Sequence, residues 1–255
     1  MEPNLPFDPV QRSEEAEKAV MKGRMRLYHK FRAAPYYGGI ATADAVGCSF
    51  LCAYCWNYGR NENPSRFGTF HSPDEVAGNL LRIARKRSYN LFRITGSEPV
   101  LGRESFSHLL EVIKIIFREE PGSRFIMETN GLMLGLKPEL GEELHFENLL
   151  VRIALKGTDP LSFEKITGSK RSFFSSTLLA LMNLERLKVR VWPALMEDLF
   201  TDAETNNLKA MLRESGVRAE LELETLEPYP VVLENMKRRG VLPRNLNRRF
   251  PAIKK

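Results

Sequence analysis

The chain has 255 residues, of which 43% are hydrophobic and 27% are charged, as in ordinary soluble globular proteins. Its 38 basic and 32 acidic residues give a net charge of +6, and no apolar run approaches the roughly 18 residues that a membrane-spanning helix needs. The N-terminus lacks the basic start and apolar stretch of a secretory signal. We therefore expect a cytoplasmic protein with no membrane partner.

Apolar, β-rich runs alternate with amphipathic stretches along the chain. Residues 1–39 are expected to form an N-terminal helical extension that ends in the loop PYYGG. The expected strands cover residues 40–46, 91–95, 124–128, 149–155, 188–193 and 219–226. The expected helices cover residues 73–86, 104–117, 173–186 and 202–214.

The alternation of strands and helices predicts βα units and a parallel sheet. Six such units fit one α/β core domain over residues 40–230, and the basic residues 231–255 are expected to form a C-terminal tail. Ser72, Pro73 and Glu75 have the spacing of an N-cap, an N1 proline and a capping box, so they predict where the first core helix begins.

All three cysteines of the chain follow directly on the first core strand, with the spacing Cys48-x3-Cys52-x2-Cys55. In parallel βα folds this end of a strand is where ligands and catalytic groups gather. Three thiolates from one loop can hold three irons of a [4Fe–4S] cluster and leave the fourth iron open, and Gly47 would allow the tight turn before them. The alternative is a zinc ion held by the cysteines with His71 as fourth ligand.

The CxxxCxxC spacing, with Tyr54 before the last cysteine, resembles the radical S-adenosylmethionine (SAM) superfamily. TGSEP at 95–99 is similar to the GGEP motif of this family. ETNG at 128–131 and IALKG at 153–157 are similar to segments of pyruvate formate-lyase activating enzymes, the second to their D-x-K element. Ser97 here replaces a glycine, and Ala154 replaces the aspartate of D-x-K. The resemblance covers roughly residues 40–226.

The resemblance implies a partial (β/α)6 TIM-type barrel with Cys48, Cys52 and Cys55 as ligands of a [4Fe–4S] cluster. The amino and carboxylate groups of SAM would chelate the open iron. Reductive cleavage of SAM would give a 5′-deoxyadenosyl radical that abstracts hydrogen from a substrate. The electron would come from a donor such as flavodoxin or ferredoxin.

The resemblance also implies a set of cofactor-binding residues. They are Tyr54, Gly96, Ser97, Glu98, Pro99, Thr129, Asn130 and Lys156. Backbone groups of residues 96–99 would hydrogen-bond the methionine ammonium, and Lys156 would pair with the carboxylate. Thr129 and Asn130 would contact the ribose or the carboxylate, and Tyr54 would pack under the adenine.

Side chains alternate across a strand, so residues two apart share a face. The polar faces of the last three expected strands give a set of candidate substrate-binding residues. They are Arg152, Arg190, Trp192, Glu222 and Glu224. If these faces line the barrel interior, an arginine–glutamate contact is expected across the cavity, because buried charges need partners. In the alternative arrangement the faces are reversed and the charges meet helices or solvent.

Two enzymatic functions remain open. The ETNG and LKG segments favour an activase that acts on the glycine of a glycyl-radical enzyme. The inward charges and the basic tail would suit a stand-alone enzyme that modifies a small polar or anionic molecule, a peptide or RNA. A third class is a binding protein that uses its cluster only as a redox sensor.

Overall fold

The computed structural model describes residues 4–244, which form a sheet with the strand order β1-β2-β3-β5-β6-β7-β8-β9, and β4 pairs with β2. The strands are β1 (Met21–Lys22), β2 (Met25–Ala34), β3 (Ile40–Ala45), β4 (Thr69–His71), β5 (Leu91–Thr95), β6 (Arg124–Thr129), β7 (Leu149–Leu155), β8 (Val191–Met196) and β9 (Glu222–Glu224). From β3 to β9 all neighbours on this path are parallel, whereas β2 is antiparallel to β1, β3 and β4. The expected α/β fold with a mostly parallel, partial-barrel sheet is confirmed.

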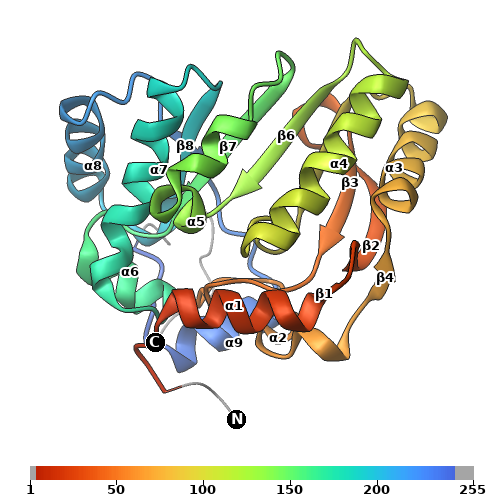
Figure 1. Cartoon of the computed structure of the whole chain (residues 1–255). Coiled ribbons are helices and arrows are strands. Elements are labelled where there is room, and N and C mark those ends of the chain that lie inside the picture. The colour runs from red at the N-terminus through yellow and green to blue at the C-terminus, as the bar shows by residue number, and fades with distance from the viewer. Residues whose placement is uncertain (1–3, 245–255) are drawn as a thin grey trace.

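Helices flank this sheet, and three of them cross one of its edges (Figure 1). The helices are α1 (Pro9–Val20), α2 (Tyr58–Glu62), α3 (Pro73–Arg87), α4 (Arg103–Glu119), α5 (Leu132–Leu136), α6 (Pro160–Thr167), α7 (Phe174–Arg186), α8 (Asp202–Glu214) and α9 (Pro230–Arg238). The arrowheads of β3 and β6 point toward the edge of the sheet crossed by α1, α2 and α9. That edge is therefore the one at which the parallel strands end.

The helix start predicted at Ser72 is present. Ser72 Oγ accepts a hydrogen bond from the Glu75 amide at 3.2 Å, and Glu75 Oε2 accepts one from the Ser72 amide at 2.8 Å. Pro73 occupies the first helical position, where its missing N–H costs nothing. Local sequence alone is thus sufficient to begin α3 at this residue.

The N-terminal extension differs from the expectation of a helical segment. Only Pro9–Val20 is a long helix, and Met25–Ala34 is a strand that pairs with β3 from Tyr28 to Ala34. Charged residues interrupt the apolar pattern of this strand, and its tertiary pairing with β3 overrides the weak local signal. At the other end, part of the expected basic tail forms α9, and residues 245–255 lie outside the described residues.

Two strands differ in extent from those predicted. The strand expected at 188–193 begins at Val191, because Lys188 has a positive φ of 59° in the turn that ends α7. The strand expected at 219–226 is reduced to Glu222–Glu224. Its flanks bond to side chains instead, since Glu185 accepts from the Ala219 amide and Asp198 from the Leu226 amide.

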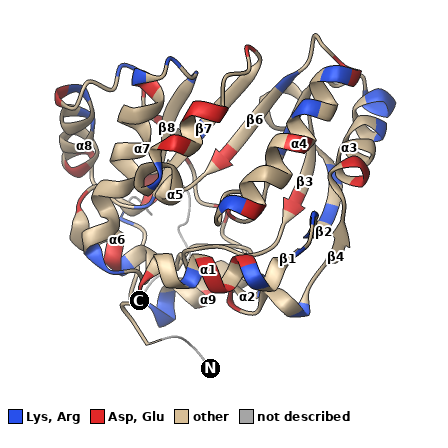
Figure 2. Cartoon of the chain, viewed as in Figure 1, with Lys and Arg blue, Asp and Glu red and all other residues tan. Residues whose placement is uncertain are grey.

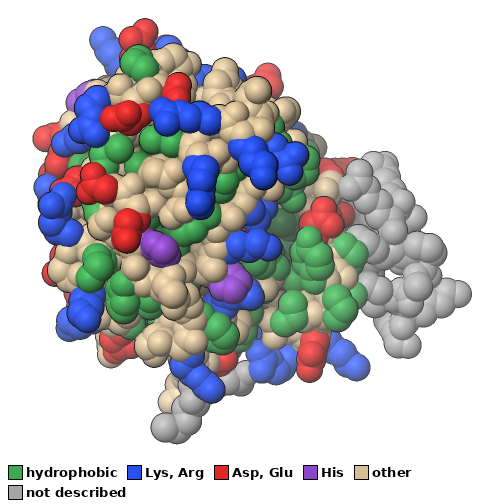
Figure 3. Space-filling view, turned by 90° about the vertical axis from the view of Figure 1, so that its right-hand side faces the viewer, with side chains coloured by type: hydrophobic (Ala, Val, Ile, Leu, Met, Phe, Trp, Pro, Cys, Tyr) green, Lys and Arg blue, Asp and Glu red, His purple; other side chains and the backbone are tan. Residues whose placement is uncertain are grey.

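The surface on the side of β2, β4 and α3 carries basic, acidic, apolar and histidine side chains interspersed with one another (Figure 3). Positive charge is therefore spread over this face together with the other side-chain types. Within residues 4–244, no helix combines the length and the apolar character needed to cross a membrane.

Candidate active site

A cavity of about 790 Å³ lies at the edge where the parallel strands end, and Cys48, Cys52 and Cys55 all line it. Gly47 precedes them with a φ of 91°, and a β-carbon at this position would lie 2.9 Å from Val20 Cγ1. The turn into the cysteine loop therefore requires glycine, as the sequence predicted.

Burial dominates the acidity of the three thiols. It raises the pKa of Cys48 to about 12 and the pKa values of Cys52 and Cys55 to about 11. Without a metal the thiols therefore stay protonated at neutral pH, whereas a coordinated metal deprotonates a thiol outright. This loop suits metal coordination better than it suits a free nucleophilic thiolate.

The structure does not bring His71 and the three cysteines together as a zinc site. His71 contacts Thr69 Oγ1 at 2.8 Å and packs edge-on against Phe31, and it does not line the cavity. Over residues 4–244, no three His, Cys, Asp or Glu side chains gather around a point that a single metal ion could occupy. A tetrahedral zinc site requires such convergence, while a [4Fe–4S] cluster takes its thiolates at separate irons.

The GSEP loop (residues 96–99) follows β5 and faces the cysteines. Gly96 has a φ of 84°, and a β-carbon there would lie 3.2 Å from Asp44 Cβ. Ser97 lines the cavity and donates a hydrogen bond from Oγ to Asn61 Oδ1 at 2.6 Å. The serine that departs from the family motif thus has a specific partner in this chain.

Glu98 lies between the GSEP loop and the ETNG loop (residues 128–131). Its Oε1 accepts from Thr129 Oγ1 at 2.6 Å and from the Val100 amide at 3.0 Å, and its Oε2 accepts from the Asn130 amide at 2.7 Å. Burial raises the pKa of Glu98 to about 7, although these three donors stabilise the charged form. The carboxylate therefore fastens the two loops together.

Arg26 supports the same loop from behind. Its guanidinium is fully buried and donates to the carbonyl oxygens of Glu98, at 2.6 Å, and Pro99. Pro99 is itself buried and does not line the cavity. Sequence reasoning missed Arg26, because β2 was expected to be part of a helical extension.

Asn130 is committed to protein contacts. Its Nδ2 donates to Ser49 Oγ at 2.8 Å and lies 4.0 Å from Cys48 Sγ, and its Oδ1 accepts from the Leu132 amide at 2.9 Å. The ETNG loop therefore also fixes the cysteine loop, and a contact of its side chains with SAM remains a prediction.

Lys156 follows β7 and lies over the ring of Tyr54, with Nζ 5.4 Å from the ring centroid. Both residues line the cavity. Burial alone would lower the pKa of Lys156, but Tyr54, Cys52 and Glu224 raise it. The lysine is therefore a protonated donor at the cavity wall, beside the aromatic ring.

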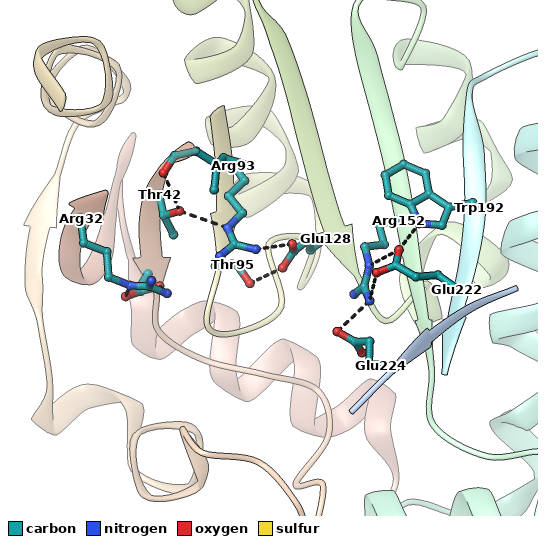
Figure 4. Close-up of polar contacts among 11 residues, drawn as sticks. Arg32, Thr42, Arg93, Thr95, Glu128, Arg152, Trp192, Glu222 and Glu224 are labelled. Carbon is teal, nitrogen blue, oxygen red and sulfur yellow. Dashed lines mark hydrogen bonds and ion pairs between the residues drawn. The ribbon is translucent and has the colours of Figure 1, made fainter. Parts of the chain in front are cut away.

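The expected arginine–glutamate contact is present within the barrel (Figure 4). Arg152 on β7 is 5% exposed and donates to both Glu222 oxygens at 3.1 Å, and it pairs with Glu224 at 2.7 Å. Trp192 Nε1 also donates to Glu222. Burial alone would lower the pKa of Arg152, but the two carboxylates raise it, so one charged arginine faces two glutamates.

A second set of charged pairs was not predicted. Arg93 Nη1 contacts Glu128 Oε1 at 2.6 Å, and Thr95 Oγ1 donates to the other Glu128 oxygen. Arg32 on β2 makes a bidentate contact with Asp44 at 2.7 and 3.0 Å. Asp44 and Glu128 are the penultimate residues of β3 and β6, and Figure 2 shows acidic residues at the arrowheads of both strands. Strand parity could have revealed Arg93, but Arg32 lies on a strand that was missed.

Arg190 does not belong to this interior set, contrary to the prediction. It precedes β8, is exposed and does not line the cavity. The reason is the displaced start of the strand, which leaves Arg190 at the end of the sheet opposite the cysteines. Trp192 keeps its contact with Glu222 but packs with the apolar residues Ile40, Leu91 and Ile126 below the cavity.

The family model of the Radical SAM superfamily matches residues 44–196, more than half of the chain. The chain belongs to the radical SAM superfamily. The matched segment begins on β3 before the cysteine loop and runs through β8, so it includes all four motifs of the cavity. The protein is therefore an enzyme of this superfamily.

Two curated relatives share part of this radical SAM sequence. The chain is 33% identical over 122 residues to a probable GTP 3′,8-cyclase of Thermoplasma volcanium, covering 48% of this chain and 33% of that one. It is 27% identical over 142 residues to the GTP 3′,8-cyclase of Microcystis aeruginosa, covering 55% and 41%. The chain thus spans less than half the length of these relatives. Both are named GTP 3′,8-cyclases, so the resemblance to pyruvate formate-lyase activating enzymes is not confirmed.

Solved radical SAM structures share the fold. A spore photoproduct lyase with bound AdoMet and dinucleoside spore photoproduct has a TM-score of 0.60 at 13% identity, covering 84% of this chain and 64% of that one. SuiB of Streptococcus suis bound to its precursor peptide SuiA has a TM-score of 0.57 at 13% identity, covering 76% and 42%. Native anSMEcpe with bound AdoMet has a TM-score of 0.53 at 16% identity, covering 72% and 53%.

The cysteine loop of this radical SAM enzyme fits the cluster that the superfamily implies. The Phe50 amide lies 3.5 Å from Cys48 Sγ, and Asn61 Nδ2 lies 3.7 Å from Cys55 Sγ. N–H groups directed at sulfur are the partners that charged cluster thiolates need in a buried site.

Proposed function

We propose that this protein binds a [4Fe–4S] cluster through Cys48, Cys52 and Cys55 and uses it to cleave SAM reductively. The observation that carries the proposal is that these thiols line the same cavity as the GSEP loop, the ETNG loop and Lys156. When bound, the cluster supplies an electron and an open iron for SAM, and a donor such as flavodoxin or ferredoxin supplies that electron.

The chain's own groups would bind and orient SAM. Backbone groups of Gly96 and Ser97 would receive the methionine ammonium, and the protonated Lys156 would pair with its carboxylate. Tyr54 would offer its ring to the adenine. The side chains of Glu98 and Asn130 would act mainly by holding the loops in place, since their polar atoms are already bonded within the protein.

The substrate would lie beside SAM, against the charged interior formed by Arg152, Glu222 and Glu224. A cavity of about 790 Å³ lies within the range of small-molecule sites, about 300–1,000 Å³. Its paired charges could exchange hydrogen bonds with a polar ligand at little cost, because each keeps a partner. We therefore favour a stand-alone enzyme that acts on a small polar molecule.

A purine nucleotide is the first substrate to test, because the curated relatives are GTP 3′,8-cyclases. The alternative, a glycyl-radical-enzyme activase, rests on the ETNG and LKG segments. The solved neighbours bind a dinucleoside or a peptide, so the shared fold does not choose among substrate classes.

Cluster binding is tested by anaerobic reconstitution with iron and sulfide. The wild-type chain and His71→Ala should each hold one [4Fe–4S] cluster, while Cys48→Ala, Cys52→Ala and Cys55→Ala should lose it. Loss of metal in His71→Ala, or one zinc per wild-type chain, would contradict the proposal.

Substrate class is tested by incubating the reduced enzyme with SAM and deuterated purine nucleotides. Transfer of deuterium into 5′-deoxyadenosine should occur with a nucleotide. Transfer only from a peptide that carries the glycyl-radical sequence would support the activase instead.

A further inference from the structure

A polar bridge joins the loop after the cysteines to the GSEP loop. Asn57 Nδ2 donates to the Gly96 carbonyl at 2.6 Å, and Ser97 Oγ donates to Asn61 Oδ1 at 2.6 Å. Asn57 and Asn61 are 1% and 2% exposed, so water has little access to the asparagine side of these bonds. The two asparagines therefore tie α2 to the loop that is proposed to hold the SAM methionine.

Asn61 continues the bridge to a cluster ligand. A side-chain amide accepts only through its oxygen and donates only through its nitrogen. Because the Ser97 hydroxyl occupies Oδ1, the amide is oriented with Nδ2 toward Cys55 Sγ, 3.7 Å away. Arg12 fixes the same residue from α1 by donating to the Asn61 carbonyl oxygen.

We propose that Ser97, Asn61 and Cys55 form a relay that couples SAM binding to the reduction potential of the cluster. The proposal rests on the proposed function, since it needs both cofactors at the assigned loops. Asn61 acts as a positioning residue that donates to the ligand sulfur, and Ser97 sets its orientation from the SAM side. A serine at the second position of the GSEP loop, where glycine is usual, is what makes the relay complete.

The sign of the effect follows from charge. Reduction adds negative charge to the cluster and its sulfurs, and an N–H donor stabilises that charge, so Asn61 raises the potential. SAM that engages the GSEP loop changes the geometry at Ser97 and hence the strength of the Asn61–sulfur bond. By linkage, reduction must then change the affinity for SAM by the same factor as SAM changes the reduction equilibrium.

Asn57 provides a matched control. It ties α2 to the same loop and is equally buried, but its side-chain Nδ2 contacts the Gly96 carbonyl at 2.6 Å and Ser97 Oγ at 3.4 Å. Its bond to Cys55 comes from the backbone amide, which alanine keeps. Asn57→Ala therefore weakens the loop without removing a donor from sulfur. A merely structural role for Asn61 would make the two alanine variants alike.

The test is an EPR-monitored redox titration of the reconstituted full chain with and without saturating SAM. Asn61→Ala should lower the SAM-free potential and shrink the SAM-induced shift, whereas Asn57→Ala should leave the SAM-free potential unchanged. Ser97→Ala should shrink the SAM-induced shift, and the double variant Ser97→Ala/Asn61→Ala should show non-additive effects.

Full cluster loading with unchanged potentials in Asn61→Ala overturns the relay while leaving the proposed function intact. If Asn61→Ala fails to fold, Ser97→Ala decides, and a wild-type SAM-induced shift in that variant overturns the relay. A wild-type chain that takes up no cluster overturns the proposed function and the relay together.

Discussion

Glu98 and Thr129, which lie 31 residues apart in the chain, are joined by a hydrogen bond of 2.6 Å from Thr129 Oγ1 to Glu98 Oε1. The bond fastens the loop after β5 to the last residue of β6, and the Asn130 amide in the loop after β6 adds a second bond to Glu98 Oε2. A motif glutamate whose carboxylate is buried and fully engaged is part of the scaffold of the site. Its sequence position alone would have assigned it to the cofactor.

Glu98→Gln should destabilise the protein by about 1–3 kcal/mol, because the amide nitrogen turns a donor toward groups that need an acceptor. The free energy of unfolding in urea measures the loss. Glu139→Gln, at an exposed position, is the control and should change it little. Equal stability of the wild type and Glu98→Gln would show that the carboxylate does not fasten the loops.

Lys156→Ala should weaken SAM binding about ten- to hundred-fold, the range for losing a charge-assisted hydrogen bond in a buried site. Equilibrium binding of SAM to the reconstituted protein measures this, with iron content verified to be unchanged. Lys86→Ala, on the exposed end of α3, should bind SAM like the wild type. An unchanged dissociation constant in Lys156→Ala would remove the lysine from the SAM site.

Glu222→Gln should keep uncoupled SAM cleavage within about two-fold of the wild type while product formation falls at least about ten-fold. The glutamine oxygen can still accept from Arg152 Nε and Trp192 Nε1, which share Glu222 Oε2, but the amide nitrogen replaces the Oε1 that accepts from Arg152 Nη2. The bidentate contact and the negative charge are lost, so the charged interior rearranges without touching the cysteine loop. Arg190→Ala is the control, since this exposed arginine should affect neither reaction. Loss of SAM cleavage in Glu222→Gln would move this residue out of the substrate role.

His108 predicts a pH dependence of stability. It is buried, with Nε2 3.0 Å from Tyr28 Oη and Nδ1 2.8 Å from the Arg24 carbonyl, and burial lowers its pKa to about 4. The unfolded chain therefore binds the proton more strongly between pH 6.5 and about 4. The contribution of neutral His108 to the free energy of unfolding should be complete above pH 6.5. The free energy of unfolding should fall by up to about 3 kcal/mol as pH decreases through this window.

Urea unfolding at pH 7 and pH 5 measures this dependence. His108→Gln should show a smaller difference between the two pH values than the wild type, and His145→Gln, at an exposed position, should not. The same pH difference in the wild type and His108→Gln would contradict the assignment.

Features with a strong local signal were predictable from the sequence. The Cys48–Cys55 spacing, the Ser72 capping box and the glycine turn at Gly47 each depend on neighbouring residues, and each is present. The arginine–glutamate contact of Arg152 followed from strand parity and the need of buried charges for partners.

Features that depend on tertiary pairing were not predictable. Met25–Ala34 becomes a strand because β3 offers an edge, and with it Arg26 and Arg32 reach the site. Arg190 was misplaced because a three-residue shift in the start of β8 removes it from the barrel interior. The hydrogen bond between Ser97 and Asn61 joins segments that are far apart in the sequence, and no residue spacing predicts it.

Cys48, Cys52 and Cys55 are proposed to hold a cluster that cleaves SAM. The most direct test is to reconstitute the chain anaerobically, add dithionite and SAM, and quantify 5′-deoxyadenosine for the wild type, His71→Ala and Cys52→Ala. We expect 5′-deoxyadenosine from the first two proteins and none from Cys52→Ala. A colourless wild-type protein that binds one zinc and leaves SAM intact would contradict this proposal.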